Sequence, residues 1–201
     1  MVRPRQISDE AILDGARECF LEHGPGVSTV AIAQRLGVSQ GVLFQRFGTK
    51  NELMLAALAP LERPRWTAQL ERGPDQRALP EQLREIADAA TDFFEEIVPK
   101  VAVLRGAGIE PRSAFRDSDL PAPVVAQRRL ATWLRLALSQ RRVRPCDPDA
   151  VALMFLGALQ IRPFLAHVAR DIGPEREIYL DHLVENLWRM IAPDSKDPAD
   201  D

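Results

Sequence analysis

Residues 28–50 read STVAIAQRLGVSQGVLFQRFGTK, and this stretch is the most informative part of the chain. Ser28 or Thr29 and, further on, Ser39 are typical helix N-caps, and Gly37 can end a helix in the left-handed conformation. The spacing predicts two helices of about two turns each, separated by residues 37–39. Helices shorter than about 12 residues are rarely stable alone, so other helices must support this pair.

Two short helices joined by such a tight turn are typical of a helix-turn-helix. Ala33 is small at the point where the two helices must cross closely, and apolar residues on both helices predict a buried seam between them. We expect the buried side chains to be those of Val30, Ile32, Ala33, Leu36, Val38 and Leu43.

The charges of this stretch favour a nucleic-acid partner, although the whole chain has a net charge of −3. Residues 28–50 contain three cations, Arg35, Arg46 and Lys50, and no acidic residue. The C-terminal tail, in contrast, is mainly acidic. A protein needs only a local positive face to meet phosphate, so the overall charge does not argue against DNA binding.

The whole chain has the composition of an ordinary globular protein. It has 201 residues, of which 46% are hydrophobic and 27% charged. This length can bury a core that needs no disulfide or metal, and the widely separated Cys19 and Cys146 are expected to be free thiols. The N-terminus has no apolar signal core, and the longest apolar run, residues 150–159, is too short to span a bilayer. We therefore expect a cytoplasmic protein.

Apolar residues recur at intervals of three and four along nearly the whole chain, which predicts an all-α fold. A first helix is expected to begin at Ser8, and the capping box of Thr49 and Glu52 predicts a fourth. Longer helices are expected at about 80–99, 122–142, 147–170 and 174–192. We predict an N-terminal three-helix helix-turn-helix domain over 1–59 (helix-turn-helix at about 28–47), a helical domain over 60–192 and a disordered acidic tail over 193–201.

The stretch from Thr29 through Gly37 and Gln40 to Glu52 resembles the DNA-binding domain of the tetracycline-repressor (TetR) family. The resemblance covers about residues 8–58 and is specific in its spacing, whereas the later helices resemble the family only in number and length. It implies a ligand-responsive transcriptional regulator, with repression the expected mode. Such a regulator would bind a palindromic DNA operator as a dimer and be released by a small effector.

The resemblance also implies roles for single residues. Thr29 and Lys50 would bind phosphates, and the second helix of the pair would face base edges or their flanking phosphates. Glutamine suits adenine, arginine suits guanine, and a valine can contact a thymine methyl. Phe44 stands where the family usually has a tyrosine that reaches a phosphate, and Arg46 stands where it often has histidine. The predicted DNA-binding residues are Thr29, Gln40, Gly41, Val42, Phe44, Gln45, Arg46 and Lys50.

The last two helices, at about 147–170 and 174–192, are suited to dimerisation. Gly157 and Ala158 would let helices approach closely, and the last helix carries apolar residues on two stripes. A helix that is apolar on two sides packs against its own domain and against something else, which favours a four-helix bundle made by two chains. The alternative is that both stripes belong to the internal core.

The middle helices carry an aromatic set that would line an effector pocket, and its content suggests an apolar or aromatic ligand. The alternative is simple core packing, and the polar candidates, which also include Glu95 and His167, are not singled out by their spacing. The predicted pocket residues are Trp66, Phe93, Phe94, Arg105, Phe115, Trp133, Phe155, Gln160 and Phe164.

An enzyme is not expected, because the sequence has no nucleophile motif and no phosphate loop. The three histidines have no metal-ligand spacing with each other or with the cysteines, so neither a metal nor another cofactor is expected. Two alternatives from other classes stay open. One is a helical small-molecule-binding protein that has lost DNA binding, and the other is a DNA-binding protein without an effector.

Overall fold

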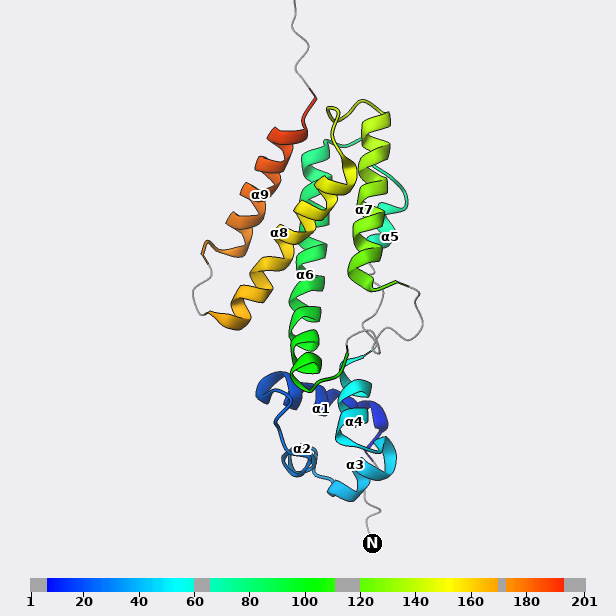
Figure 1. Cartoon of the computed structure of the whole chain (residues 1–201), viewed down its shortest axis with the longest axis vertical. Coiled ribbons are helices and arrows are strands. Elements are labelled where there is room, and N and C mark those ends of the chain that lie inside the picture. Colours follow the sequence, from blue (N-terminus) through cyan, green and yellow to red (C-terminus); the bar gives the residue numbers. More distant parts are fainter. Residues whose placement is uncertain (1–6, 60–65, 111–119, 170–172, 194–201) are drawn as a thin grey trace, which may run out of the picture. The chain divides into compact units, whose positions relative to one another are not determined.

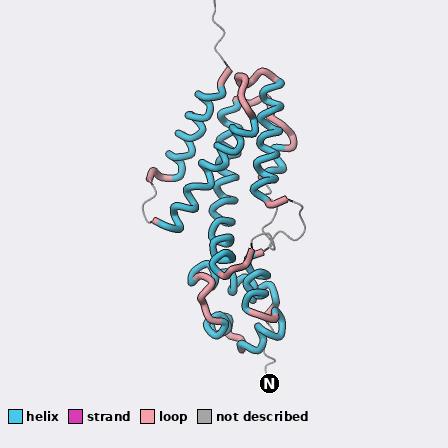
Figure 2. The backbone as a smooth tube through the Cα atoms, in the orientation of Figure 1, coloured by secondary structure: helices cyan, strands magenta, loops and turns pink. Residues whose placement is uncertain are grey.

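The computed structural model describes residues 7–59, 66–110, 120–169 and 173–193. Within these ranges the regular structure is helical and contains no strand, as Figures 1 and 2 show. The all-α prediction is therefore confirmed. The chain divides into two compact units: unit 1 comprises residues 1–62 and 99–119, and unit 2 comprises residues 63–98 and 120–201.

Unit 1 contains four short helices, and the last turns of α6 (Leu79–Gly106) are grouped with it. Each short helix is preceded by an N-cap residue whose side chain accepts a hydrogen bond from the backbone N–H three residues later. This bond satisfies one of the N–H groups that have no partner within the helix. The four are α1 (Asp9–His23), α2 (Thr29–Leu36), α3 (Gln40–Phe47) and α4 (Lys50–Leu58), with caps Ser8, Ser28, Ser39 and Thr49.

The core of unit 1 confirms part of the predicted helix-turn-helix seam. Ile32, Ala33 and Leu43 are almost completely buried. Leu36 and Val38 are only half-buried, and the side chain of Val30 is 47% exposed, which corrects the prediction that it is buried. The buried face of α2 starts at Thr29 and continues with Ile32 and Ala33, the i, i+3, i+4 pattern of one helix face. Val30 lies one residue away from this face, and a helix of eight residues is short enough to fit either phase of the apolar pattern.

Unit 2 contains the first part of α6 together with α5 (Thr67–Leu70), α7 (Ala122–Ser139), α8 (Pro148–Val168) and α9 (Arg176–Ile191). The predicted long helices are all present. The four-residue helix α5 was not predicted, because so short a segment shows no periodicity. Helix α6 continues past Pro99 to Gly106, beyond the expected end near Pro99.

Ion pairs join α6 to α9 inside unit 2. Arg84 of α6 pairs with Asp181 at 2.8 Å and with Glu177, both on α9. In return, Arg176 of α9 pairs with Glu95 of α6 at 3.2 Å, among other carboxylates of that helix. The apolar face of α9 that packs inward consists of Leu180, Val184, Leu187 and Ile191. The ion pairs therefore fix α9 to α6 within unit 2.

Candidate nucleic-acid interface

Helix α3 is held in place by a single buried side chain and presents most of the others outward. Leu43 is 1% exposed and anchors the helix, while Ser39 caps it by accepting a hydrogen bond from the backbone N–H of Val42 at 3.4 Å. Val42 is half-buried. The remaining candidates on α3, Gln40, Gly41, Phe44, Gln45 and Arg46, are exposed. This leaves one face of α3 with amide, aromatic and cationic groups and no carboxylate.

Two of the predicted DNA-binding residues meet across the turn. Nε2 of Gln40, the first residue of α3, donates a hydrogen bond of 2.6 Å to Oγ1 of Thr29, the first residue of α2. Thr29 is only 8% exposed, so its hydroxyl occupies a well-defined position. The contact joins the starts of the two helices of the helix-turn-helix.

Arg46, near the end of α3, is tied to the start of α1. Its Nη1 donates to the backbone oxygen of Ile7 at 2.7 Å and pairs with Oδ1 of Asp9 at 3.0 Å. The arginine charge is thus partly balanced inside unit 1. Any contact of Arg46 with a base or phosphate competes with these two interactions.

Lys50, at the start of α4, is also engaged within the protein. Its Nζ donates a hydrogen bond of 2.6 Å to the backbone oxygen of Pro25, in the loop between α1 and α2. The same proline packs against the end of α6, because a Cβ added to Gly106 would lie 3.1 Å from Cγ of Pro25. Lys50 therefore joins the start of α4 to a loop that is also in contact with α6.

The third cation of the stretch, Arg35, faces α1 rather than solvent alone. It pairs with Glu18 at 3.2 Å and with Glu22 at 2.6 Å. The hydrogen bond from Arg35 lowers the pKa of the Glu22 carboxyl. The local positive charge counted in residues 28–50 is therefore reduced by carboxylates of α1, which a count within that stretch does not include.

Two apolar side chains are exposed on α2 and α3, and there is space beside a glycine of α3. Phe44 is 41% exposed, and Val30 on α2 is similarly exposed. A Cβ added to Gly41 would meet only Oγ of Ser39, at 3.7 Å, so the protein itself leaves room for a side chain there. Unit 1 itself therefore does not require a glycine at this position.

The predicted pocket residues are distributed over several environments. Phe94, Trp133 and Phe155 are buried in unit 2, and Phe93 packs edge-on against Phe94 with ring centroids 5.5 Å apart. Trp66 is half-buried, and its buried indole N–H has no hydrogen-bond partner among the described residues.

Three other candidates are exposed, and the rest cannot be placed. Gln160 and Phe164 lie on the exposed side of α8, and Arg105 is exposed within unit 1. Phe115 lies outside the described residues, as does the side chain of His167. The aromatic residues that lie in the core of unit 2 are thus a subset of those that were predicted.

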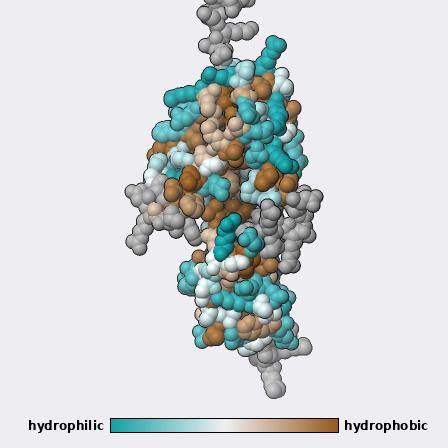
Figure 3. Space-filling view, in the orientation of Figure 1, coloured by the Kyte–Doolittle hydropathy of each residue, from teal (hydrophilic) through white to brown (hydrophobic). Residues whose placement is uncertain are grey.

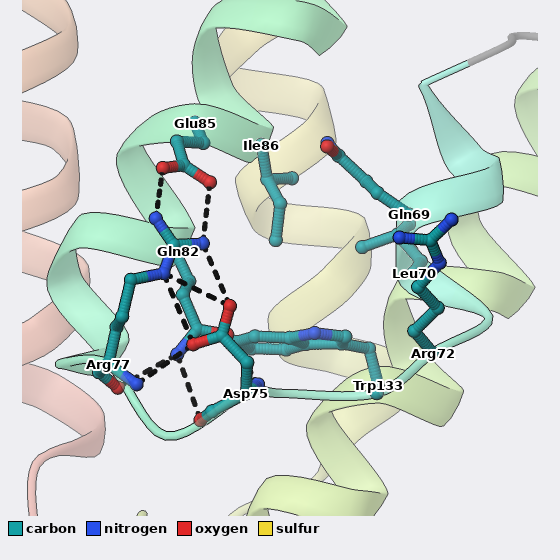
Figure 4. A pocket seen from close by; sticks show the side chains of 10 residues that line it. Gln69, Leu70, Arg72, Asp75, Arg77, Gln82, Glu85, Ile86 and Trp133 are labelled. Carbon is teal, nitrogen blue, oxygen red and sulfur yellow. Dashed lines mark hydrogen bonds and ion pairs between the residues drawn. The ribbon is translucent and has the colours of Figure 1, made fainter.

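A hollow of about 360 Å³ lies in unit 2 between α5, the loop that follows it, the start of α6 and Trp133 of α7 (Figure 4). Arg77 pairs with Asp75 at 2.8 Å and with Glu85, and its hydrogen bonds lower the pKa of both carboxyls. Gln82 bonds the backbone of the loop, donating to the oxygens of Asp75 and Arg77. The polar groups of this hollow largely form hydrogen bonds with one another. These bonds hold the loop after α5 against the start of α6, which indicates a structural role.

Comparison with known proteins places this architecture in a family. The profile described as "Bacterial regulatory proteins, tetR family" matches residues 12–57. The HTH-type transcriptional repressor Rv1474c of Mycobacterium tuberculosis is 31% identical over 183 residues, which cover 89% of this chain and 91% of that protein. The HTH-type transcriptional repressor AcnR of Corynebacterium glutamicum is 44% identical over 50 residues, 24% of this chain and 27% of its own length.

Solved structures agree with the fold. The TetR-family regulator PfmR of Thermus thermophilus superposes with a TM-score of 0.64 at 23% identity, over 89% of this chain and 97% of its own. The SmeT–triclosan complex superposes with a TM-score of 0.60 at 22% identity, over 92% of each chain. Since the match to the repressor Rv1474c extends over nearly the full length of both proteins, the chain belongs to the TetR family of bacterial regulatory proteins and is a transcriptional repressor rather than an enzyme.

Proposed function

We propose that this repressor binds a near-palindromic operator as a homodimer and releases it when a small apolar or aromatic effector binds unit 2. The observation that carries the DNA-binding part is the outward face of α3, which is anchored by Leu43 and free of carboxylates. In helix-turn-helix proteins the second helix enters the major groove by its N-terminal end, where Gln40 and Gly41 stand here.

We propose the same roles for the eight DNA-binding residues, and three of them also form hydrogen bonds within the protein. Gln40, Arg46 and Lys50 donate hydrogen bonds within the free protein, so DNA must either share or replace those partners. A threonine hydroxyl can accept one hydrogen bond and donate another, so Thr29 can keep its hydrogen bond from Gln40 when the protein binds DNA. The contacts of Arg46 and Lys50 end on carbonyl or carboxylate oxygens, for which phosphate is a direct substitute.

The exposed face of α8 supports the homodimer. Leu153 is 66% exposed, and Met154, Ile161 and Phe164 are each between 44% and 51% exposed. Leu153, Gly157, Ile161 and Phe164 follow the i, i+4, i+8, i+11 spacing of one helix face, and Met154 lies next to it. Among the described residues, no atom would lie within 4 Å of a Cβ added to Gly157. Figure 3 shows hydrophobic side chains over the part of unit 2 where Figure 1 draws α8.

A second chain is the partner that we propose for this face, because a two-fold interface lets the same apolar surface cover itself. Helix α9 would take part through Ile178 and Met190, which are 48% and 42% exposed. Residues Pro148–Ala166 of α8 are long and apolar enough to cross a membrane, a test that core helices of soluble proteins also pass. Dimerisation would account for this apolar surface.

The effector part of the proposal rests on the aromatic side chains in unit 2. Phe94, Trp133 and Phe155 are buried between its helices, where an apolar or aromatic molecule could replace part of the packing. Two proteins of the same fold support ligand response: one is named SmeT in complex with triclosan, and another is named the flavonoid-responsive regulator FrrA. A coupling of about 1–3 kcal/mol would change operator affinity about 5- to 150-fold.

Selection of binding sites from random double-stranded DNA tests the operator proposal. The purified protein should enrich an inverted repeat whose half-sites are read by two α3 helices about 34 Å apart. Enrichment of no sequence would favour the alternative of a ligand-binding protein that has lost DNA binding. A screen of lipophilic compounds for thermal stabilisation then tests the effector, since each hit should weaken binding to the selected operator. Hits that leave operator affinity unchanged would remove the induction mechanism.

A further inference from the structure

We propose that Thr29 is a positioning residue that sets the orientation of the Gln40 side chain and thereby the base that α3 reads. This inference rests on the proposed DNA-binding function and adds a determinant of specificity to it. Its basis is the 2.6 Å hydrogen bond from Nε2 of Gln40 to Oγ1 of Thr29. The resemblance to the family gave Thr29 only a phosphate contact.

The side chain of Thr29 has less conformational freedom than that of Gln40. Thr29 therefore positions Gln40, and not the reverse. Thr29 is 8% exposed and lies in the first turn of α2, where Ser28 caps the helix through the N–H of Ala31 at 3.1 Å. Gln40 is exposed and has three rotatable side-chain bonds. A long exposed amide ordinarily loses much conformational entropy when it is immobilised on a base. The threonine hydroxyl removes part of that freedom before DNA arrives.

The hydrogen bond also determines which groups of Gln40 remain available. A glutamine amide has two N–H donors and one carbonyl acceptor, and the contact with Thr29 uses one of the donors. One N–H and the carbonyl oxygen are left. Adenine presents a matching acceptor, N7, and donor, the N6 amino group, in the major groove, whereas guanine presents two acceptors there. The held side chain therefore favours adenine over guanine.

Thr29 can keep this contact while it binds a phosphate. Its oxygen accepts the hydrogen bond from Gln40, which leaves its own O–H to donate to a phosphate oxygen. The hydrogen bonds then run in one direction, from Gln40 to Thr29 and from Thr29 to the phosphate, and bonds in such a chain polarise and strengthen one another. A backbone contact, which carries no sequence information alone, would in this way support base recognition.

The test compares Thr29→Val, which keeps the shape but removes the hydroxyl, with Thr29→Ser, Gln40→Ala and the double variant Thr29→Val/Gln40→Ala. Affinity is measured for the selected operator and for versions in which each base pair of the half-site is replaced in both half-sites. The wild type should prefer an A·T pair at one position by about 5- to 150-fold, the range for one paired contact. Because the preference is a ratio within one protein, partial unfolding of a variant does not change it.

We expect Gln40→Ala to abolish that preference and Thr29→Val to reduce it at least about fivefold, while Thr29→Ser keeps it. In the Gln40→Ala background, Thr29→Val should not alter the preference further. If Thr29→Val weakens all sequences equally and keeps the adenine preference, Thr29 is a phosphate ligand alone and the inference is wrong. If Gln40→Ala changes discrimination at no position, the assignment of α3 as the reading helix fails, and the inference fails with it.

Discussion

Gly48 leaves the space that the carboxylate of Glu52 occupies. A Cβ added to Gly48 would overlap Oε2 of Glu52. This oxygen accepts a hydrogen bond of 2.7 Å from the backbone N–H of Thr49 and completes the capping box of α4. Gly48 also has a φ of 73°, a conformation that other residues rarely adopt. The backbone angle at the junction between α3 and α4 thus favours glycine, and a larger residue would also displace the Glu52 carboxylate from the capping box.

Replacement of Gly48 by alanine should destabilise the protein by about 1–3 kcal/mol, the range for a residue forced into unfavourable backbone angles. Urea denaturation followed by circular dichroism measures the change. Gly26→Ala is the matched control, because a Cβ there meets nothing within 4 Å and its φ is ordinary. Equal effects of the two substitutions would contradict the requirement at Gly48.

The capping box should lose its contribution at low pH. The hydrogen bond from the Thr49 backbone lowers the pKa of Glu52 below its ordinary 4.5, so the charged form is favoured in the folded state. The resulting stability is fully present above pH 4.5 and is lost as the pH falls through the folded pKa. The stability difference between wild type and Glu52→Gln should therefore shrink on acidification from pH 7 to pH ~3. A constant difference would show that Glu52 is not held in its charged form.

Gly41→Ala should separate stability from DNA binding. The added methyl group has open space in the free protein, and alanine is the better helix former by up to about 1 kcal/mol, so stability should be unchanged or raised. Operator affinity should fall, because the methyl group would stand where the N-terminal end of α3 approaches the bases. Thermal unfolding and operator titration measure the two effects. An unchanged operator affinity would mean that DNA does not approach α3 closely at this point.

Lys50→Ala should weaken binding to all DNA sequences alike and reduce the salt dependence of binding by about one ion, as expected for the loss of one phosphate contact. Titrations of the operator and of random DNA at several salt concentrations give both quantities. The hydrogen bond to Pro25 offers a competing explanation. If Lys50 only stabilises that loop, the variant will lose thermal stability, while the salt dependence of its DNA binding will equal that of the wild type.

Leu153→Glu should convert the proposed homodimer into monomers, because Leu153 is 66% exposed in the single chain and the substitution would place a charge in the proposed apolar interface. Sedimentation velocity at micromolar concentration measures the mass. Leu136→Glu on α7 is the matched control, since Leu136 is also an exposed leucine of unit 2 but lies on a different helix. A wild type that sediments as a single chain would contradict the dimer outright.

The helix boundaries of unit 1 could be predicted because caps act locally. Ser8, Ser28, Ser39 and Thr49 each bond a backbone N–H three residues away, so every signal and its target lie within one turn of sequence. The same holds for the helix-turn-helix spacing and for the family resemblance built on it. These features predict an all-α chain with a helix-turn-helix without any knowledge of its packing.

The phase of short helices could not be predicted in this way. Val30 fits the apolar pattern of α2 but is exposed, and α5 is too short to show any pattern. Over one or two turns, local propensity and periodicity do not decide which side of a helix is covered. That choice depends on the neighbouring helices, so only the tertiary structure made it.

The partners of the candidate DNA-binding side chains were likewise decided by tertiary structure. Gln40 bonds Thr29 across 11 residues, Lys50 bonds Pro25 across 25, and Arg46 reaches Ile7 across 39. The sequence indicated that these side chains are polar and lie on or near α3. It contained no information on which exposed groups would come within 3 Å of each other, because such distances result from how the helices cross.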